Sequence, residues 1–323
     1  MAPVATLPMT KLSLYFMLSM LRDDPTMDGS VVKKHHWTYT GLEGPEHWPQ
    51  TYQHCGGKRQ SPIDIVSHAC QYDPTLPNFR LSNFDALSTQ VGMGTNLNFT
   101  NNGHAASVRV TGNMFVEGGG LPGRYRTAEF HFHWGSRDDT GSEHAIEGVK
   151  YPLEMHVVNY AARYDTLTEA VDQDDGLAVL GVLFQISDRD NPAFEPLAES
   201  LQYIHKAGEF QMVGGVRLRS LLPKDTSRFY RYSGSLTTPK CFETVTWTIF
   251  EEPQKISARQ LARLRDLLHE DGHYSDVTND PKSGSVGGAH NAHNYLVDNW
   301  RPLQALHSRI IKQSFPFASP RTG

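Results

Sequence analysis

Apolar residues in this chain recur mainly at every second position, in short runs separated by glycine, proline and asparagine. A period of two is typical of β-strands, whereas helical periodicity appears in few places. Of the two best helical patterns, residues 257–269 begin with Ser257, which can serve as an N-cap. The pattern predicts strands at 97–100, 107–110, 128–134, 154–160, 177–186 and 243–250, and helices at 193–204 and 257–269.

Many strands and few helices predict one large, mainly antiparallel sheet with small helices on its surface. No linker, charge block or repeat divides residues 33–314, so we expect a single domain there and a short tail at 315–323. Residues 1–32 are expected to be disordered or a signal peptide, because the apolar run at 12–21 is too short to span a bilayer. Residues 270–294 have no apolar period and are interpreted as a solvated loop, although they contain His273, His290 and His293.

Composition narrows the classes of function. The 323 residues are 38% hydrophobic and 20% charged with a net charge of −5, as in an ordinary soluble protein. The mild acidity and the absence of a basic stretch argue against nucleic acid as the main partner. The three cysteines show no C-x-x-C spacing, which argues against a cysteine metal cluster. Two of them could pair and leave one free.

Candidate chemistry centres on residues 129–134, Glu-Phe-His-Phe-His-Trp. On a strand, His131 and His133 face one side while the aromatic residues face the other. A neighbouring strand offers His156, which follows Glu154 by two residues and therefore shares its face. Three neutral nitrogens with an open fourth position form the ligand set of a catalytic zinc. Alone, a His-x-His pair is more often a packing feature, so further segments have to support this interpretation.

Two polar residues suit a role beside such a metal. A threonine hydroxyl that accepts the proton of a zinc-bound hydroxide, and donates to a buried carboxylate, fixes the orientation of that hydroxide. Thr237 and Glu143 could form this relay, although each also fits a common turn or helix start. Apolar residues in the same segments could form a small pocket for an uncharged substrate, with core packing as the alternative. They are Val158, Val179, Leu236, Val245 and Trp247.

Taken together, these motifs resemble the alpha class of carbonic anhydrases from about residue 36 to residue 310. The resemblance implies a twisted central sheet of mostly antiparallel strands. It also implies reversible hydration of carbon dioxide to bicarbonate and a proton by a zinc-bound hydroxide, with inhibition by sulfonamides. The segments that carry it are QSPIDI (60–65), NNGHAASV (101–108), EFHFHWG (129–135), GSEHAIEGVKYPLEMHVV (141–158), DGLAVLG (175–181), YSGSLTTP (232–239) and VDNWRP (297–302).

The resemblance also assigns roles to individual residues. It places Zn²⁺ on His131, His133 and His156, with Glu154, Glu129 and Asn299 around these ligands. Thr237 and Glu143 take the relay roles, and His104 stands at the position of a proton shuttle. The substrate pocket is assigned to Val158, Val179, Leu236, Thr237, Thr238 and Trp247, and the water path for protons to Tyr39, Asn102 and Ser107.

Three positions depart from the family pattern. Glu129 stands where glutamine is usual, Ser107 where asparagine is common, and Lys240 where a second proline often follows. None of these changes removes a catalytic group, but the first two put the rate in question. Two other functions stay open at this point: a non-catalytic binding module that keeps zinc for stability, and a metal-dependent hydrolase of another kind.

Cys55 and Cys241 match the positions that secreted and membrane-bound members of the family join by a disulfide. We therefore expect secretion, with a cytoplasmic protein that starts at an internal methionine as the alternative. Asn98 lies in a glycosylation sequon, and residues 314–323 contain no apolar tail that would indicate an anchor. The expected partners are a small-molecule substrate, no nucleic acid and no membrane span, and the expected state is a monomer.

Overall fold

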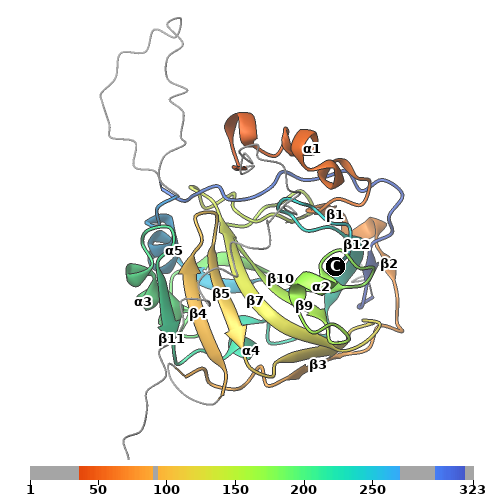
Figure 1. The fold of residues 1–323 in the computed structure, drawn as a ribbon. Helices are drawn as coiled ribbons and strands as arrows, with labels where there is room; N and C mark the ends of the chain where they lie inside the picture. Colours follow the sequence, from red (N-terminus) through yellow and green to blue (C-terminus); the bar gives the residue numbers. More distant parts are fainter. Residues whose placement is uncertain (1–35, 90–93, 270–294, 317–323) are drawn as a thin grey trace, which may run out of the picture. The chain divides into compact units, whose positions relative to one another are not determined.

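The computed structural model describes residues 36–89, 94–269 and 295–316, most of which lie in strands or in the turns between them (Figure 1). The α-helices are α1 (Trp48–Thr51), α2 (Leu167–Ala170), α3 (Glu195–Ser200), α4 (Leu218–Leu221) and α5 (Ala258–Arg265), and the 3-10 turns are η3 (Gly41–Glu43), η4 (Gln53–Gly56), η5 (Ser67–Ala69) and η6 (Leu201–Tyr203). The strands are β1 (Asp64–Ile65), β2 (Gln71–Tyr72), β3 (Phe79–Ser82), β4 (Asn96–Asn101), β5 (Ala106–Thr111), β6 (Phe115–Gly118), β7 (Tyr125–Trp134), β8 (Ala145–Ile146), β9 (Leu153–Ala161), β10 (Leu177–Ser187), β11 (Phe210–Val213), β12 (Phe229–Gly234), β13 (Val245–Phe250), β14 (Gln254–Ser257) and β15 (Lys312–Gln313).

Within the described residues, thirteen strands form one twisted sheet whose main path runs β11-β4-β5-β7-β9-β10-β13-β12-β15-β2 (Figure 1). Strands β3, β6 and β14 pair beside this path, and β1 pairs with β8 separately. Most neighbours are antiparallel, but β10 runs parallel to β13 and β14, and β15 runs parallel to β2. The predicted fold class is therefore confirmed, with the refinement that the sheet is mixed. No helix in the described ranges is long and apolar enough to cross a membrane.

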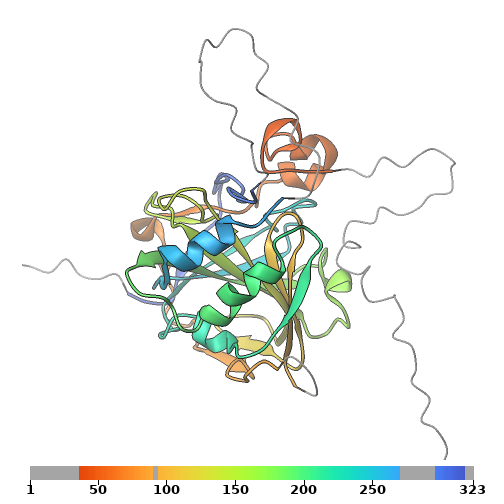
Figure 2. The same cartoon turned by 90° about the vertical axis from the view of Figure 1, so that its left-hand side faces the viewer.

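The two faces of the central strands meet different surroundings. Phe130, Phe132 and Trp134 on β7 are fully buried in the larger hydrophobic core, together with Leu197 of α3 and Leu261 of α5. Figure 2 shows these two helices side by side over one face of the sheet. The histidines that alternate with the aromatic residues on β7 therefore project from the opposite face. This alternation is what makes one face hydrophobic core and the other face available for chemistry.

Strand β9 is buried along its whole length, although it carries charged and polar side chains. It pairs with β7 on one side and β10 on the other, and both of its faces are covered. Buried polar side chains on such a strand need hydrogen-bond partners. Asn159 is an example, because its amide donates to the carbonyl oxygens of Val157 and Ala178 and accepts from the Thr127 hydroxyl.

Each of the six predicted strands overlaps an observed strand, namely β4, β5, β7, β9, β10 and β13. The prediction for β7 began at residue 128 because the pairing with β9 shifts register between Thr127 and Glu129. This irregularity interrupts the alternation of apolar and polar residues, so the sequence pattern misses the first three residues of the strand.

The helix predictions were right in type and too long. Ser257 is the N-cap of α5, and it forms a capping box with Gln260. The helix ends at Arg265 rather than at residue 269, because the amide of Leu268 donates to the carbonyl oxygen of His205. The predicted helix at 193–204 begins at Glu195 and continues as the 3-10 turn η6. His273, His290, His293 and the N-terminal apolar run lie outside the described residues.

Candidate metal centre and active site

Three imidazoles meet at the middle of the sheet. His131 and His133 project from the same face of β7, and His156 of β9 is the direct cross-strand partner of His131. The ring centroids are 5.0 Å apart for His131 and His133, 5.3 Å for His131 and His156, and 4.6 Å for His133 and His156. One nitrogen of each ring lies within 4.8 Å of the other two, a spacing at which three ligands can hold one cation.

Oxygen acceptors around the cluster determine which nitrogens stay open. His133 Nδ1 lies 2.7 Å from the main-chain oxygen of Asn299, and His156 Nε2 lies 2.6 Å from Glu154 Oε1. Carbonyl and carboxylate oxygens accept hydrogen bonds, so these two nitrogens carry the ring protons. His133 Nε2 and His156 Nδ1 then carry no proton, so each has a free lone pair that can bind a metal.

The third imidazole follows the same rule with a different acceptor. His131 Nδ1 lies 3.2 Å from Glu129 Oε1, which leaves His131 Nε2 for a metal. The other oxygen of this carboxylate lies 3.5 Å from the hydroxyl of Ser107, so the two departures from the family pattern are neighbours. In the register of β5 and β7, Ser107 is the partner of His131 and Arg109 is the partner of Glu129, so Ser107 and Glu129 are diagonal neighbours.

Burial keeps two of these rings neutral. It lowers the pKa of His133 to about 3, against the opposing effect of its bond to Asn299. It lowers the pKa of His156 to about 4, against the opposing effect of Glu154. Metal binding requires the neutral imidazole, so neither ring has to lose a proton at neutral pH. His133 Nε2 is also buried and has no hydrogen-bond partner among the described residues. A cation at this point would satisfy it.

Glu154 is the acceptor on which the local chain path depends. Its buried carboxylate accepts hydrogen bonds from His156 Nε2, from His144 Nδ1 at 2.7 Å, and from the main-chain amides of Glu143 and His144, both at 2.8 Å. Burial raises the pKa of Glu154, but the charges and hydrogen bonds of His144 and His156 outweigh it and hold the pKa well below its ordinary value.

His144, Glu154 and His156 also lie within metal-binding distance of one another. Their hydrogen bonds to one another make them a support for the first cluster rather than a second site.

A second buried carboxylate faces the open nitrogens. Glu143 Oε2 lies 3.6 Å from His133 Nε2 and 3.9 Å from His156 Nδ1, and Glu143 Oε1 accepts a hydrogen bond of 2.8 Å from the main-chain amide of Arg301. The pKa of Glu143 is raised above its ordinary value, because burial outweighs the opposing effects of His156, the Arg301 amide and the nearby Thr237 hydroxyl. The structure therefore brings Thr237 and Glu143 together beside the histidines.

Apolar side chains form a row next to the cluster. Val158 of β9 pairs with Val179 of β10, which pairs with Trp247 of β13, and all three are at least 94% buried. Directly paired residues face the same side of a sheet, so the row continues the face of the three histidines. Leu236 and Thr238 are half-buried in the segment that also contains Thr237. The pocket residues predicted from the sequence thus lie on adjacent strands and one loop.

The predicted proton path lies at the end of β4. His104 stacks on Trp37, with ring centroids 4.0 Å apart and an interplanar angle of 14°. Asn102 Oδ1 accepts from the amides of His104 and Ala105, which fixes the turn that carries the imidazole. Tyr39 contacts Trp37 at 5.3 Å, and burial raises its pKa well above the ordinary value. Tyr39 and His104 therefore contact the same indole ring, and Asn102 supports the turn of His104.

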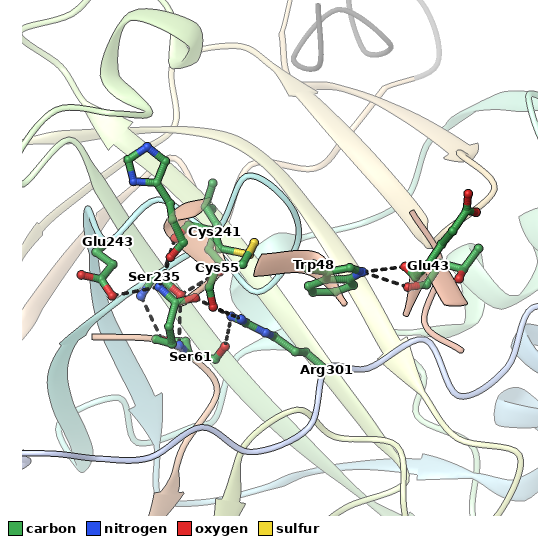
Figure 3. Close-up of a disulfide and its surroundings, with 12 residues drawn as sticks. Glu43, Trp48, Cys55, Ser61, Ser235, Cys241, Glu243 and Arg301 are labelled. Carbon is green, nitrogen blue, oxygen red and sulfur yellow. Dashed lines mark hydrogen bonds between the residues drawn. A yellow bond between two sulfur atoms is a disulfide. The ribbon is translucent and has the colours of Figure 1, made fainter. Parts of the chain in front are cut away.

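The disulfide between Cys55 and Cys241 joins two segments that are 186 residues apart (Figure 3). The buried guanidinium of Arg301 lies next to it and donates to the carbonyl oxygens of Cys55 and Ser61 and to Gln60 Oε1. The side-chain amide of Gln60 donates from Nε2 to the carbonyl oxygen of Cys241. The side chain of Arg301 therefore supports the disulfide, and its main-chain amide donates a hydrogen bond to Glu143.

Sequence reasoning assigned no role to Arg301, Gln60, Ser61 or His144. The hydroxyls of Ser61 and Ser235 accept reciprocal bonds from each other's amides, both 3.0 Å long, which fixes the start of the Thr237 loop. These residues lie within motifs that carry the family resemblance, so the motifs marked their segments. No local pattern indicated the partners, because the contacts of Arg301 with Cys55, Gln60 and Ser61 join segments at least 240 residues apart. His144 likewise contacts side chains of other segments, namely Glu154 and Tyr232.

Comparison with known proteins agrees with this geometry. A model of eukaryotic-type carbonic anhydrase matches residues 43–315. The chain belongs to this family. Among its relatives from Homo sapiens, it is 36% identical to carbonic anhydrase 7 over 87% of this chain and 98% of that protein, and 34% identical to carbonic anhydrase 3 over 86% and 98%. It is 33% identical to carbonic anhydrase 12 over 93% of this chain and 78% of that protein.

The family membership and the site agree on one activity. This carbonic anhydrase keeps the three imidazoles, the buried carboxylate and the threonine in one place, beside an apolar row. An enzyme of this family hydrates carbon dioxide, and the match over most of the chain supports this activity.

We predict that the purified protein holds one zinc ion per chain and that His156→Ala loses it. The substitution removes one of three nitrogen ligands and leaves Glu154 buried without one of its donors. Elemental analysis of dialysed protein measures this directly. His68→Ala, which changes an exposed histidine on η5, should keep its zinc. Wild-type protein without stoichiometric zinc would contradict the assignment.

We predict that Cys55→Ala/Cys241→Ala lowers the free energy of unfolding by about 5 kcal/mol in the chain-entropy model for a loop of this length. Denaturant unfolding of the oxidised proteins measures the loss. Cys70→Ala, which changes the buried free thiol and keeps the bridge, is the matched control for cysteine removal. A double variant as stable as the control would show that the bridge does not stabilise the fold.

Proposed function

We propose that the chain catalyses the reversible hydration of carbon dioxide with one zinc ion bound by His131, His133 and His156. The observation that carries this proposal is the convergence of three open imidazole nitrogens beside an apolar row on the same face of the sheet. The donor set is three neutral nitrogens, which suits zinc and leaves room for a fourth ligand. When bound, zinc would act as a Lewis acid that makes a water molecule at the open position acidic near neutral pH.

Thr237 and Glu143 would orient the nucleophile. When ionised, the carboxylate of Glu143 would accept from the nearby Thr237 hydroxyl, which leaves the hydroxyl oxygen to accept a hydrogen bond from the reacting group. A group that donates its hydrogen to Thr237 presents its lone pair to the substrate instead. The amide of Arg301 favours the ionised form of Glu143 and thereby supports this direction of donation.

The apolar row would hold the substrate. Carbon dioxide carries no charge and forms weak hydrogen bonds, so Val158, Val179 and Trp247 can surround it without leaving a polar group unpaired. The indole nitrogen of Trp247 donates to the carbonyl oxygen of Ser235 at 3.0 Å, which fixes the ring as one wall. Bicarbonate, in contrast, is charged and polar, so this surface favours release of the product.

Each turnover leaves one proton to be removed, and His104 is the proposed shuttle. Its imidazole has two ring nitrogens, one of which can take up a proton while the other releases one. Burial lowers the pKa of His104 to about 3, so a proton that it takes up is passed on quickly. Asn102 supports its position through the turn, and Tyr39 would contribute to the water path.

We also propose that the protein is secreted. The bridge between Cys55 and Cys241 supports this, because disulfides persist in oxidising compartments. The sequon at Asn98 contributes little, since this residue lies within β4 between β5 and β11 and its amide oxygen is buried.

Stopped-flow hydration of carbon dioxide on protein of known zinc content tests the proposed function. We expect activity that rises with pH through the neutral range and that a sulfonamide abolishes by occupying the open position of the metal. Apo-protein prepared by chelation should be inactive and should recover with added zinc. Activity that persists under saturating sulfonamide would contradict an open catalytic metal.

Glu129 should adjust the properties of the metal. A carboxylate that accepts the proton of His131 Nδ1 makes the ring a stronger electron donor than an amide acceptor would. A stronger donor binds the metal more tightly and lowers the positive charge that it presents to the open position. Hydration should therefore reach half of its maximal rate at higher pH than it would with glutamine at residue 129.

We predict that Glu129→Gln moves the midpoint of the hydration profile to lower pH and weakens zinc binding on the order of 10-fold. Stopped-flow rates between pH 5 and 9 and competition with a chelator measure the two effects, with the pH range chosen about the neutral pKa of a zinc site. Glu252→Gln, which makes the same change at an exposed residue between β13 and β14, is the control. A midpoint that stays in place would show that the carboxylate does not influence the metal.

A further inference from the structure

The imidazole of His104 is enclosed in a way that raises the question of how a proton leaves it. The ring lies flat against Trp37, and its Nδ1 atom is buried without a hydrogen-bond partner among the described residues. The His104 side chain as a whole is half-buried, so the enclosed atom is Nδ1 in particular. A proton on Nδ1 needs a neighbouring group to reach the solvent.

Two further imidazoles lie next to this ring. The centroid of His269 is 5.8 Å from that of His104, with the rings nearly perpendicular, and the centroid of His36 is 6.1 Å away. Burial first, and then the charges of His269 and His36, lower the pKa of His104 to about 3. A proton on His104 in this position is therefore short-lived at neutral pH and passes readily to any acceptor nearby.

One buried side chain fixes His104 and His269 relative to each other. Asn101 Oδ1 accepts from the amide of Gly103 at 2.9 Å, within the turn that carries His104. Asn101 Nδ2 donates to the carbonyl oxygen of Leu268 at 2.9 Å, directly before His269. Asn101 is fully buried, so it holds the main chain of the two histidine segments together although they are far apart in the sequence. His269 itself is half-buried and reaches solvent.

We propose that His269 is a proton-relay residue that accepts the proton from His104 and delivers it to buffer. The inference rests on the proposed function, because it concerns the proton that each hydration releases. One N–H bond of the His104 imidazolium breaks and one N–H bond forms on neutral His269, directly or through one water molecule. His269 then loses the same proton to a buffer base, which returns both rings to the neutral form.

His36 is the competing acceptor. Its Nδ1 lies 3.0 Å from Glu43 Oε2. The Asn101 contact favours His269, because it joins the main chain next to His269 to the turn of His104. Variants of the two histidines, compared in the same buffer, separate the two routes.

The test measures hydration and the exchange of ¹⁸O between carbon dioxide and water on zinc-loaded protein in weak buffer. His269→Ala should lower kcat by about 3- to 10-fold, less than the ~10²-fold or more that a directly positioned acid–base group contributes, and leave kcat/KM unchanged. Imidazole buffer should restore kcat. His104→Ala should also lower kcat, and His104→Ala/His269→Ala should be no slower than His104→Ala, because both residues serve one path. His269→Gln, which keeps the size of the side chain, should behave like His269→Ala.

Several results would overturn the relay. Wild-type kcat in His269→Ala together with a slow His36→Ala would assign the route to His36. An equal fall in kcat and kcat/KM without rescue by imidazole would make His269 a structural residue. An unchanged kcat in His104→Ala would remove the donor on which the relay depends. Wild-type protein without hydration activity would contradict the proposed function as well, whereas active wild type with an unaffected His269→Ala contradicts the relay alone.

Discussion

The site depends on three oxygen acceptors, two of them buried, that fix where the ring protons of three histidines lie. Because Glu154 and the Asn299 carbonyl take the outer hydrogens of His156 and His133, the inner nitrogens converge as lone pairs. A buried polar group without a partner is costly, so these contacts constrain the surrounding chain as well as the rings. Glu154 also accepts from the amides of Glu143 and His144, and the path of the loop that carries Glu143 follows from it.

The sheet supplies the space that this carboxylate needs. Gly181 on β10 is the cross-strand partner of His156, and a Cβ atom there would lie 3.3 Å from Glu154 Oε1 and 2.5 Å from Ile249 Cδ1. A larger residue would push the side chain of Ile249 aside and press against the carboxylate of Glu154. The absence of a side chain at Gly181 therefore makes room for Glu154 on the face that carries the histidines. The opposite face of the sheet is hydrophobic core.

The sequence predicted the parts of this arrangement that depend on local periodicity. Alternation on β7 placed His131 and His133 on one face, and Ser257 marked the start of α5. Long-range partners could not be predicted in this way, since nothing near Arg301 in the chain indicates that its side chain meets the Cys55 carbonyl. The neighbourhood of His104 and His269 was missed for the same reason. It depends on Asn101, whose amide joins segments 167 residues apart.

The central claim is that three imidazole nitrogens, and no sulfur, bind one metal ion. X-ray absorption at the zinc edge of the native protein tests it most directly, because it reports the ligand atoms without relying on activity. The account predicts three nitrogen ligands and one oxygen ligand in a four-coordinate site, and loss of one nitrogen ligand or of the metal in His131→Ala. A sulfur ligand, or a six-coordinate site of oxygen atoms, would contradict it.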